Sequence, residues 1–132
     1  MKPYQKILWW TPRVLCIIAI LFISLFAFDA FSPERNLWQN IGALLIHLLP
    51  SFALVALLVV AWKWELVGGI LITIMGLVAT PFLFNMNSRP NNSVGETLGI
   101  VLIITFPFVI TGVLFIISHY VNRKQRTGHQ LS

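Results

Sequence analysis

The sequence predicts an all-α, polytopic integral membrane protein built as an antiparallel four-helix bundle. Of its 132 residues, 58% are hydrophobic and only 10% are charged, whereas an average soluble domain is about a quarter charged. The apolar residues fall into four runs, each close to the roughly 20 helical residues that cross a hydrocarbon core of about 30 Å. A soluble fold of this size could not bury so much apolar surface, so we expect most of it to face lipid.

The four runs are expected to form one membrane domain that occupies residues 1–132. Spans are predicted over about residues 12–31, 41–62, 66–84 and 98–121. They must be helices because lipid offers the backbone no hydrogen-bond partners, and the runs lack the alternation of barrel strands. The link at 63–65 is so short that the second and third helices should form a tight hairpin. The basic segment 122–132 is predicted to be a cytoplasmic tail that frays.

Several short motifs indicate where helices begin. Thr11 and Pro12 match an N-cap followed by proline at the first helical position, so the first helix is expected to start there. The Ser32-Pro33 pair repeats the pattern and suggests a second helix from residue 33. Ser93 with Glu96 fits a capping box that opens the fourth helix.

The distribution of basic residues predicts the orientation in the membrane. With four spans, seven of the nine Lys and Arg residues fall on one side, and Arg35 and Arg89 fall on the other. Cytoplasmic segments are enriched in Lys and Arg, so we expect a protein of the cell inner (plasma) membrane with both termini in the cytoplasm, N-in and C-in. The seven residues are Lys2, Lys6, Arg13, Lys63, Arg123, Lys124 and Arg126.

The same cations bear on the partners of the protein. Clustered beside the spans, they are expected to attract anionic lipid headgroups of the bilayer on the cytoplasmic side. No basic groove interleaved with aromatic residues lies outside the spans, so no nucleic-acid partner is expected. A homo-oligomer and a membrane-protein partner both stay open.

Two ionisable residues form a candidate polar intramembrane site. Asp29 lies near the outer end of the first span, and His47 lies about two turns into the second. On consecutive antiparallel helices both would sit in the outer leaflet at similar depth. Ionisable groups within a membrane are functional candidates by default, so the pair could form a proton or ligand site. Alternatively, Asp29 reaches headgroup water and His47 bonds a backbone carbonyl.

A stripe of small residues marks the third span. Its steps of four, three and four residues keep the stripe on one helix face, and small residues allow helices to approach closely in membranes. The stripe therefore predicts a helix-packing face inside the monomer, although a homodimer face and a pore lining are also compatible with it. Its members are Gly69, Thr73, Gly76 and Thr80.

No motif indicates catalysis, a cofactor or a bound metal. Cys16 is the only cysteine, so disulfides within the chain and cysteine-pair redox chemistry are excluded. His47 and His119 fall in opposite leaflets and cannot ligate one haem, and the convergent ligands of a metal cluster are missing. The middle of the first span, around Phe22 and Ile23, lacks the glutamate on which small multidrug transporters rely. We therefore expect no enzyme.

Two stretches are similar to a known family. They are the element at 46–52, with its His-Leu-Leu-Pro sequence, and the segment at 61–69, with its Ala-Trp-Lys-Trp-Glu hairpin. Over roughly residues 9–120 the chain resembles an uncharacterised family of small bacterial four-transmembrane-helix proteins, known only as a domain of unknown function. The resemblance implies a bacterial inner membrane and no known activity, so it assigns no site residues.

These observations favour a small multi-pass membrane protein that acts as a non-enzymatic accessory or interaction protein. The alternative is a small oligomeric transporter or channel that uses Asp29 and His47 in the outer leaflet. The sequence does not identify a substrate.

Overall fold

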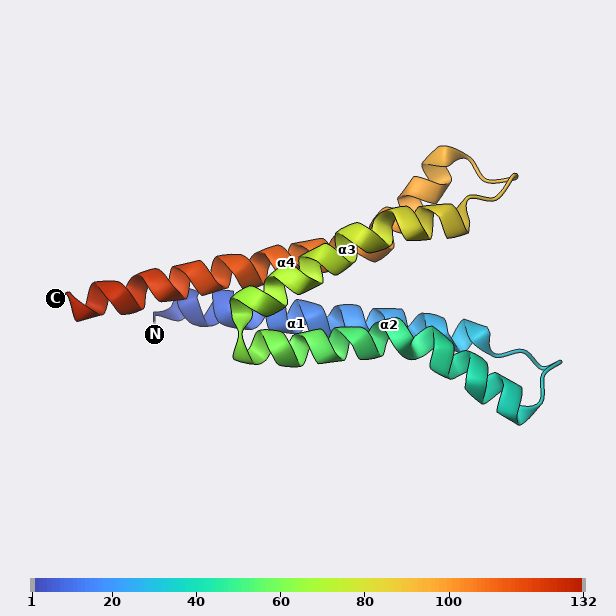
Figure 1. Cartoon of the computed structure of the whole chain (residues 1–132), viewed down its shortest axis with the longest axis horizontal. Helices are drawn as coiled ribbons and strands as arrows, with labels where there is room; N and C mark the ends of the chain where they lie inside the picture. The colour runs from blue at the N-terminus through green and yellow to red at the C-terminus, as the bar shows by residue number, and fades with distance from the viewer. Residues whose placement is uncertain (1, 132) are drawn as a thin grey trace.

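Four long helices make up the computed structural model, which describes residues 2–131 (Figure 1). They are α1 (Pro3–Phe26), α2 (Leu37–Lys63), α3 (Glu65–Asn87) and α4 (Val94–Gln130), and a short 3-10 helix, Ala27–Ala30, follows α1. No strand occurs within residues 2–131. Each of the four helices is long and apolar enough to cross a membrane, so the predicted all-helical, four-span fold class is confirmed.

The helices pack in the order in which they follow one another, and α4 returns to α1. Both termini and the α2–α3 link lie at one end of the molecule, which we call the terminal end (Figure 1). The loops at 31–36 and 88–93 lie at the other end, the loop end. The α3–α4 contact is the most extensive. Towards the loop end, the α1–α2 pair and the α3–α4 pair diverge (Figure 1).

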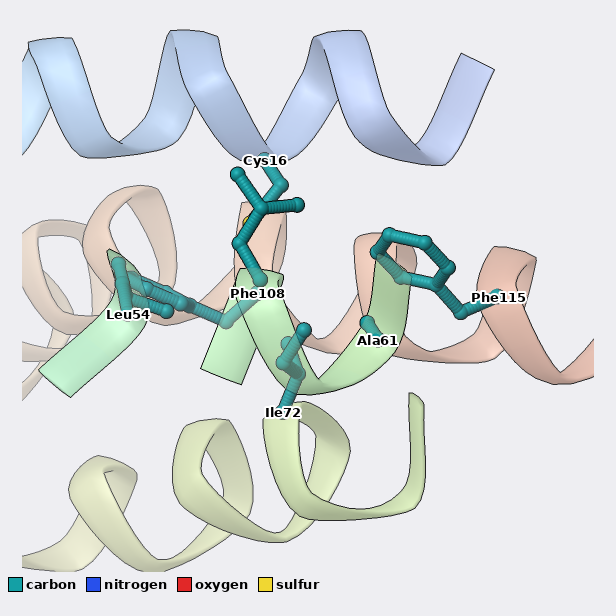
Figure 2. Close-up of a cluster of buried hydrophobic side chains, with 7 residues drawn as sticks. Cys16, Leu54, Ala61, Ile72, Phe108 and Phe115 are labelled. Atoms are coloured by element: carbon teal, nitrogen blue, oxygen red, sulfur yellow. The ribbon is translucent and has the colours of Figure 1, made fainter. Parts of the chain in front are cut away.

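Apolar side chains from all four helices fill the interior. Leu54, Ile72 and Phe115 are 0% exposed, so a water molecule cannot reach any of these three side chains. Close packing of this kind is typical of protein interiors. The labelled side chains of this cluster in Figure 2 are Cys16, Leu54, Ala61, Ile72, Phe108 and Phe115.

Large apolar side chains also cover the outside of the bundle. Trp38 is 80% exposed, Phe28 is 65% exposed and Phe82 is 63% exposed. Extensive exposure of large apolar side chains is typical of a surface that contacts a membrane or another protein. Together with the length of the helices, it indicates that the outer surface meets the lipid bilayer.

The expected start of the first helix is wrong. The helix begins at Pro3, which occupies the first helical position that suits proline, and the Lys2 amide donates to Gln5 Oε1 at 2.6 Å. Pro12 therefore lies inside α1. Thr11 is no N-cap either, because its hydroxyl donates to the Ile7 carbonyl at 2.6 Å.

The second helix also starts later than the Ser32-Pro33 pair suggests. Asn36 caps α2 in a capping box with Gln39, which supplies two hydrogen bonds at the helix start. The Asn40 side chain holds Ser32 in the preceding loop by accepting from its amide and donating to its carbonyl. These side-chain bonds favour loop structure over 31–36.

The capping box of the fourth helix is confirmed, because Ser93 and Glu96 exchange side-chain and backbone hydrogen bonds. The expectation of a fraying tail from residue 122 is wrong, since α4 continues to Gln130. With a rise of about 1.5 Å per residue, a helix of 37 residues is about 55 Å long. This length exceeds a hydrocarbon core of about 30 Å, so α4 can extend beyond the membrane at the terminal end.

The link between α2 and α3 is a single residue, Trp64. Just beyond it, Gly68 lies so close to α2 that a Cβ there would come within 2.3 Å of the Ala61 Cα. Only glycine permits this approach of the two helices.

Candidate functional site

Arg13 is the centre of a polar cluster at the terminal end. It projects from α1, and only 1% of its side chain is exposed. Its Nη2 donates to Glu65 Oε1 of α3 at 2.8 Å, and its Nη1 donates to the Trp9 carbonyl. The guanidinium carbon lies 3.6 Å from the ring centroid of Trp9, 5.4 Å from that of Trp62 and 5.5 Å from that of Phe115. One cation therefore contacts all four helices.

The surroundings of Arg13 compensate for the burial of its charge. Burying an unpaired ion costs roughly several kcal/mol of folding free energy, whereas a buried ion that is paired and hydrogen-bonded is tolerated. Glu65 provides the counter-charge from the first turn of α3, where the helix dipole favours a carboxylate. The planar guanidinium also stacks on aromatic faces, which an ammonium group does less well.

Tryptophans surround this ion pair. The Trp9 and Trp10 rings meet edge to face with centroids 5.1 Å apart, and both lie 6.3 Å from Trp62. Lys63 Nζ lies 4.9 Å from the Trp64 ring centroid. Tryptophan is enriched at the boundary between lipid and water, and such a cluster is typical of the end of a membrane span.

A cavity of about 1050 Å³ lies beside the ion pair. The first turns of α1 and the last turns of α4 form its walls, and the α2–α3 link forms its floor. At the terminal end α1 and α4 reach beyond the α2–α3 link (Figure 1). We call it the terminal cavity.

The terminal cavity carries an excess of positive charge. Five basic residues line it, and Glu65 is the only acid in the described lining. Because Glu65 already binds Arg13, four positive charges remain without a carboxylate in the cavity. They belong to Lys2, Lys63, Arg123 and Arg126.

Two buried polar atoms of the lining have no hydrogen-bond partner within the described residues, Arg13 Nε and Asn122 Oδ1. The Asn122 amide nitrogen donates to Ser118 Oγ at 3.3 Å, so the amide is held in place while its oxygen stays unpaired. A buried polar atom without a partner costs about 1–3 kcal/mol. Both residues line the cavity, but these two atoms are themselves buried and do not face it.

A comparison with known protein families assigns the chain to one of them. A family described as a domain of unknown function, DUF7670, matches residues 1–128. The chain belongs to DUF7670. The resemblance to an uncharacterised family is therefore confirmed. No curated protein and no solved structure matches the chain, so the site of this DUF7670 chain is argued from its own residues.

Asp29 and His47 lie elsewhere on the DUF7670 chain, towards the loop end. Both side chains are exposed, Asp29 in the 3-10 helix and His47 in α2. His47 Nδ1 lies 2.9 Å from the Ala43 carbonyl oxygen. Within the described residues no hydrogen bond or ion pair joins Asp29 to His47. A shared proton or ligand site remains a prediction.

The small-residue stripe of α3 faces α4. A Cβ on Gly69 would come within 2.8 Å of the Gly112 carbonyl oxygen, and a Cβ on Gly76 within 3.0 Å of Val109. Thr73 and Thr80 each donate to the carbonyl four residues earlier at 2.8 Å. The glycines therefore bring the two backbones together, while the threonine hydroxyls bond their own helix.

Sequence reasoning did not identify Arg13 and Glu65 as a pair. Arg13 was counted only among the orientation-determining cations, and Glu65 only as part of a link. The sequence does contain an indication of the pair, because Glu65 is the one acidic residue on the side of the predicted spans that has seven basic residues. Arg13 also falls inside a predicted span, where a charge is costly and usually paired.

Proposed function

We propose that this DUF7670 chain is a non-enzymatic accessory or interaction protein of a bacterial inner membrane, and that the terminal cavity is its binding site. The observation that supports the proposal is the excess of positive charge in one cavity, where four cations of the described lining stand beside a single carboxylate that already binds Arg13. A concave site with a few convergent polar groups is the usual form of a binding site.

The filled interior favours binding over conduction through a single chain. Leu54, Ile72 and Phe115 are fully buried in the core between the helices. A transporter or channel based on Asp29 and His47 would have to use the outer surface of α2, in contact with further copies of the chain. The exposed position of both residues gives that alternative no enclosed site.

A photo-crosslinking amino acid placed in living cells tests the proposal. We expect a discrete adduct when it replaces Arg126, which lines the terminal cavity, and none when it replaces Lys124, which does not. Both positions lie on the last turns of α4 and are exposed, so the pair differs mainly in access to the cavity. Equal labelling from both positions would contradict a specific site.

Proton and ion flux into proteoliposomes tests the alternative. We expect purified protein to give no more flux than protein-free vesicles. Flux that is lost with His47→Ala and with Asp29→Asn would overturn the proposal and favour the transporter. Mutation of Arg126 to Gln provides the control, since it should leave such flux unchanged.

A further inference from the structure

We infer that the terminal cavity binds the phosphate headgroup of an anionic membrane lipid. This inference rests on the proposed function, because it names the occupant of the proposed site. The phosphate would be held by Lys63 from the floor and by Arg123 and Arg126 from the α4 wall. Phosphate is a ligand that arginine binds through paired N–H groups and that lysine binds as a point charge.

The charge of the cavity selects an anion. In the described lining, four cations stand beside a single carboxylate, Glu65, which already binds Arg13. Each Lys or Arg near a membrane surface strengthens attraction to anionic lipid about fivefold. Within a concave site lined by one sign of charge the field is focused further, so an anion would be attracted from the surrounding leaflet.

The depth of the cavity selects a lipid over a soluble compound. Trp9, Trp62 and Trp64 all line it, and tryptophan occupies the headgroup level of a bilayer. Leu66 and Val67 line the cavity as well, and Val67 is 48% exposed on α3. A basic lining that also includes an exposed apolar residue of α3 matches an amphiphile, with its headgroup in the cavity and its acyl chains along the helix.

The walls of the cavity are fixed to one another. Gln125 Nε2 of α4 donates to the Tyr4 hydroxyl of α1, so the last turns of α4 are tied to the first turns of α1. Arg13 ties α1 to the floor through Glu65. The helices that carry the cationic side chains are therefore joined to one another at this end, which lowers the part of the ordering cost that comes from the helices.

The experiment measures lipid binding to the full chain purified in mild detergent, by native mass spectrometry at physiological ionic strength. Three probes are titrated separately: phosphatidylglycerol, phosphatidylcholine and inorganic phosphate. The site variant is Arg123→Gln with Arg126→Gln. The matched control is Lys6→Gln with Lys124→Gln, which removes the same charge from the same end at positions that do not line the cavity.

We expect the wild-type chain to bind phosphatidylglycerol in preference to phosphatidylcholine. The site variant should bind phosphatidylglycerol about 25-fold more weakly, about fivefold for each cation. The control should change much less, because Lys6 and Lys124 do not line the cavity and salt screens the attraction of charges that do not contact the phosphate. Circular dichroism on both variants checks that the helices are retained.

Equal losses in the site variant and the control would overturn the inference, since they would indicate diffuse attraction to the basic end. Equal binding of the two lipids would overturn it as well. If inorganic phosphate displaces phosphatidylglycerol at matched concentration, the occupant is a soluble phosphate compound; the lipid inference then fails while the proposed binding site stands. If no probe binds and no crosslink forms from position 126, the proposed function itself fails.

Discussion

At the scale of single residues, one arginine has two physical roles. As a cation near the membrane boundary, Arg13 contributes to the charge bias between the two ends. As a buried group it also joins α1 to α3 through Glu65 and stacks on Trp9. The second role requires the counter-charge, because a buried ion without its partner is strongly destabilising.

Glu65→Gln tests that dependence. The substitution removes the counter-charge but keeps the size of the side chain, so the buried Arg13 charge would be left uncompensated. We expect a loss of about 3 kcal/mol in the free energy of unfolding, measured by denaturant titration in detergent micelles. Glu34→Gln is the control, because Glu34 is exposed in the 31–36 loop and should change stability by less than about 0.5 kcal/mol. Unchanged stability in Glu65→Gln would mean that the ion pair contributes nothing.

The sequence shows that the charged and aromatic residues of the terminal cavity are present, but it does not predict that they lie close together. Arg13 and Glu65 are 52 positions apart, and no periodicity relates them. Their contact depends on α1 continuing through Pro12 and on α3 beginning directly after Trp64. The terminal cavity depends in turn on α4 remaining helical to Gln130, which the polar composition of that segment does not predict.

At the scale of elements, α3 and α4 are joined by glycines. A Cβ on Gly112 would come within 2.1 Å of Thr73 Oγ1 and 2.7 Å of the Gly69 carbonyl oxygen. These are distances that a side chain cannot occupy without moving a backbone. Small residues allow the close approach on which packing in membranes depends.

Gly112→Val tests this contact, with Gly99→Val as the control on the same helix. A Cβ at Gly99 meets no atom within 4 Å, so the control should change stability by less than about 1 kcal/mol. We expect Gly112→Val to cost about 3 kcal/mol, because overfilling a packed contact forces the backbones apart. Thermal unfolding of both variants, followed by circular dichroism in micelles, measures the difference. Equal melting temperatures would contradict the packing.

Elements that are marked by one local sequence pattern could be predicted. A helix start for which two neighbouring patterns compete could not. The structure forms one long helix over each of the four apolar runs, and the Ser93–Glu96 capping box opens α4 as predicted. The start of α2 was misplaced because the Asn36–Gln39 capping box and the Asn40 bonds to Ser32 outweigh the proline signal. A single pattern does not reveal which of two neighbouring helix starts is more stable.

At the scale of the whole molecule, the two ends differ in both charge and packing. At the terminal end, Arg13 and the single-residue link hold the helices together around a basic cavity. At the loop end, the two helix pairs diverge (Figure 1). The cations proposed to bind the headgroup therefore lie at the end where the helices are joined by an ion pair and a short link.

Reporter fusions test which side of the membrane each end faces. Seven of nine basic residues belong to the terminal end, and cytoplasmic segments are rich in Lys and Arg, so we expect the terminal end in the cytoplasm. Alkaline phosphatase, which is active only outside the cytoplasm, should be inactive when fused to the C-terminus and active when inserted in the 88–93 loop. Green fluorescent protein should give the opposite pattern. The reverse result for both reporters would place the terminal cavity outside the cytoplasm and would move its lipid to the other leaflet.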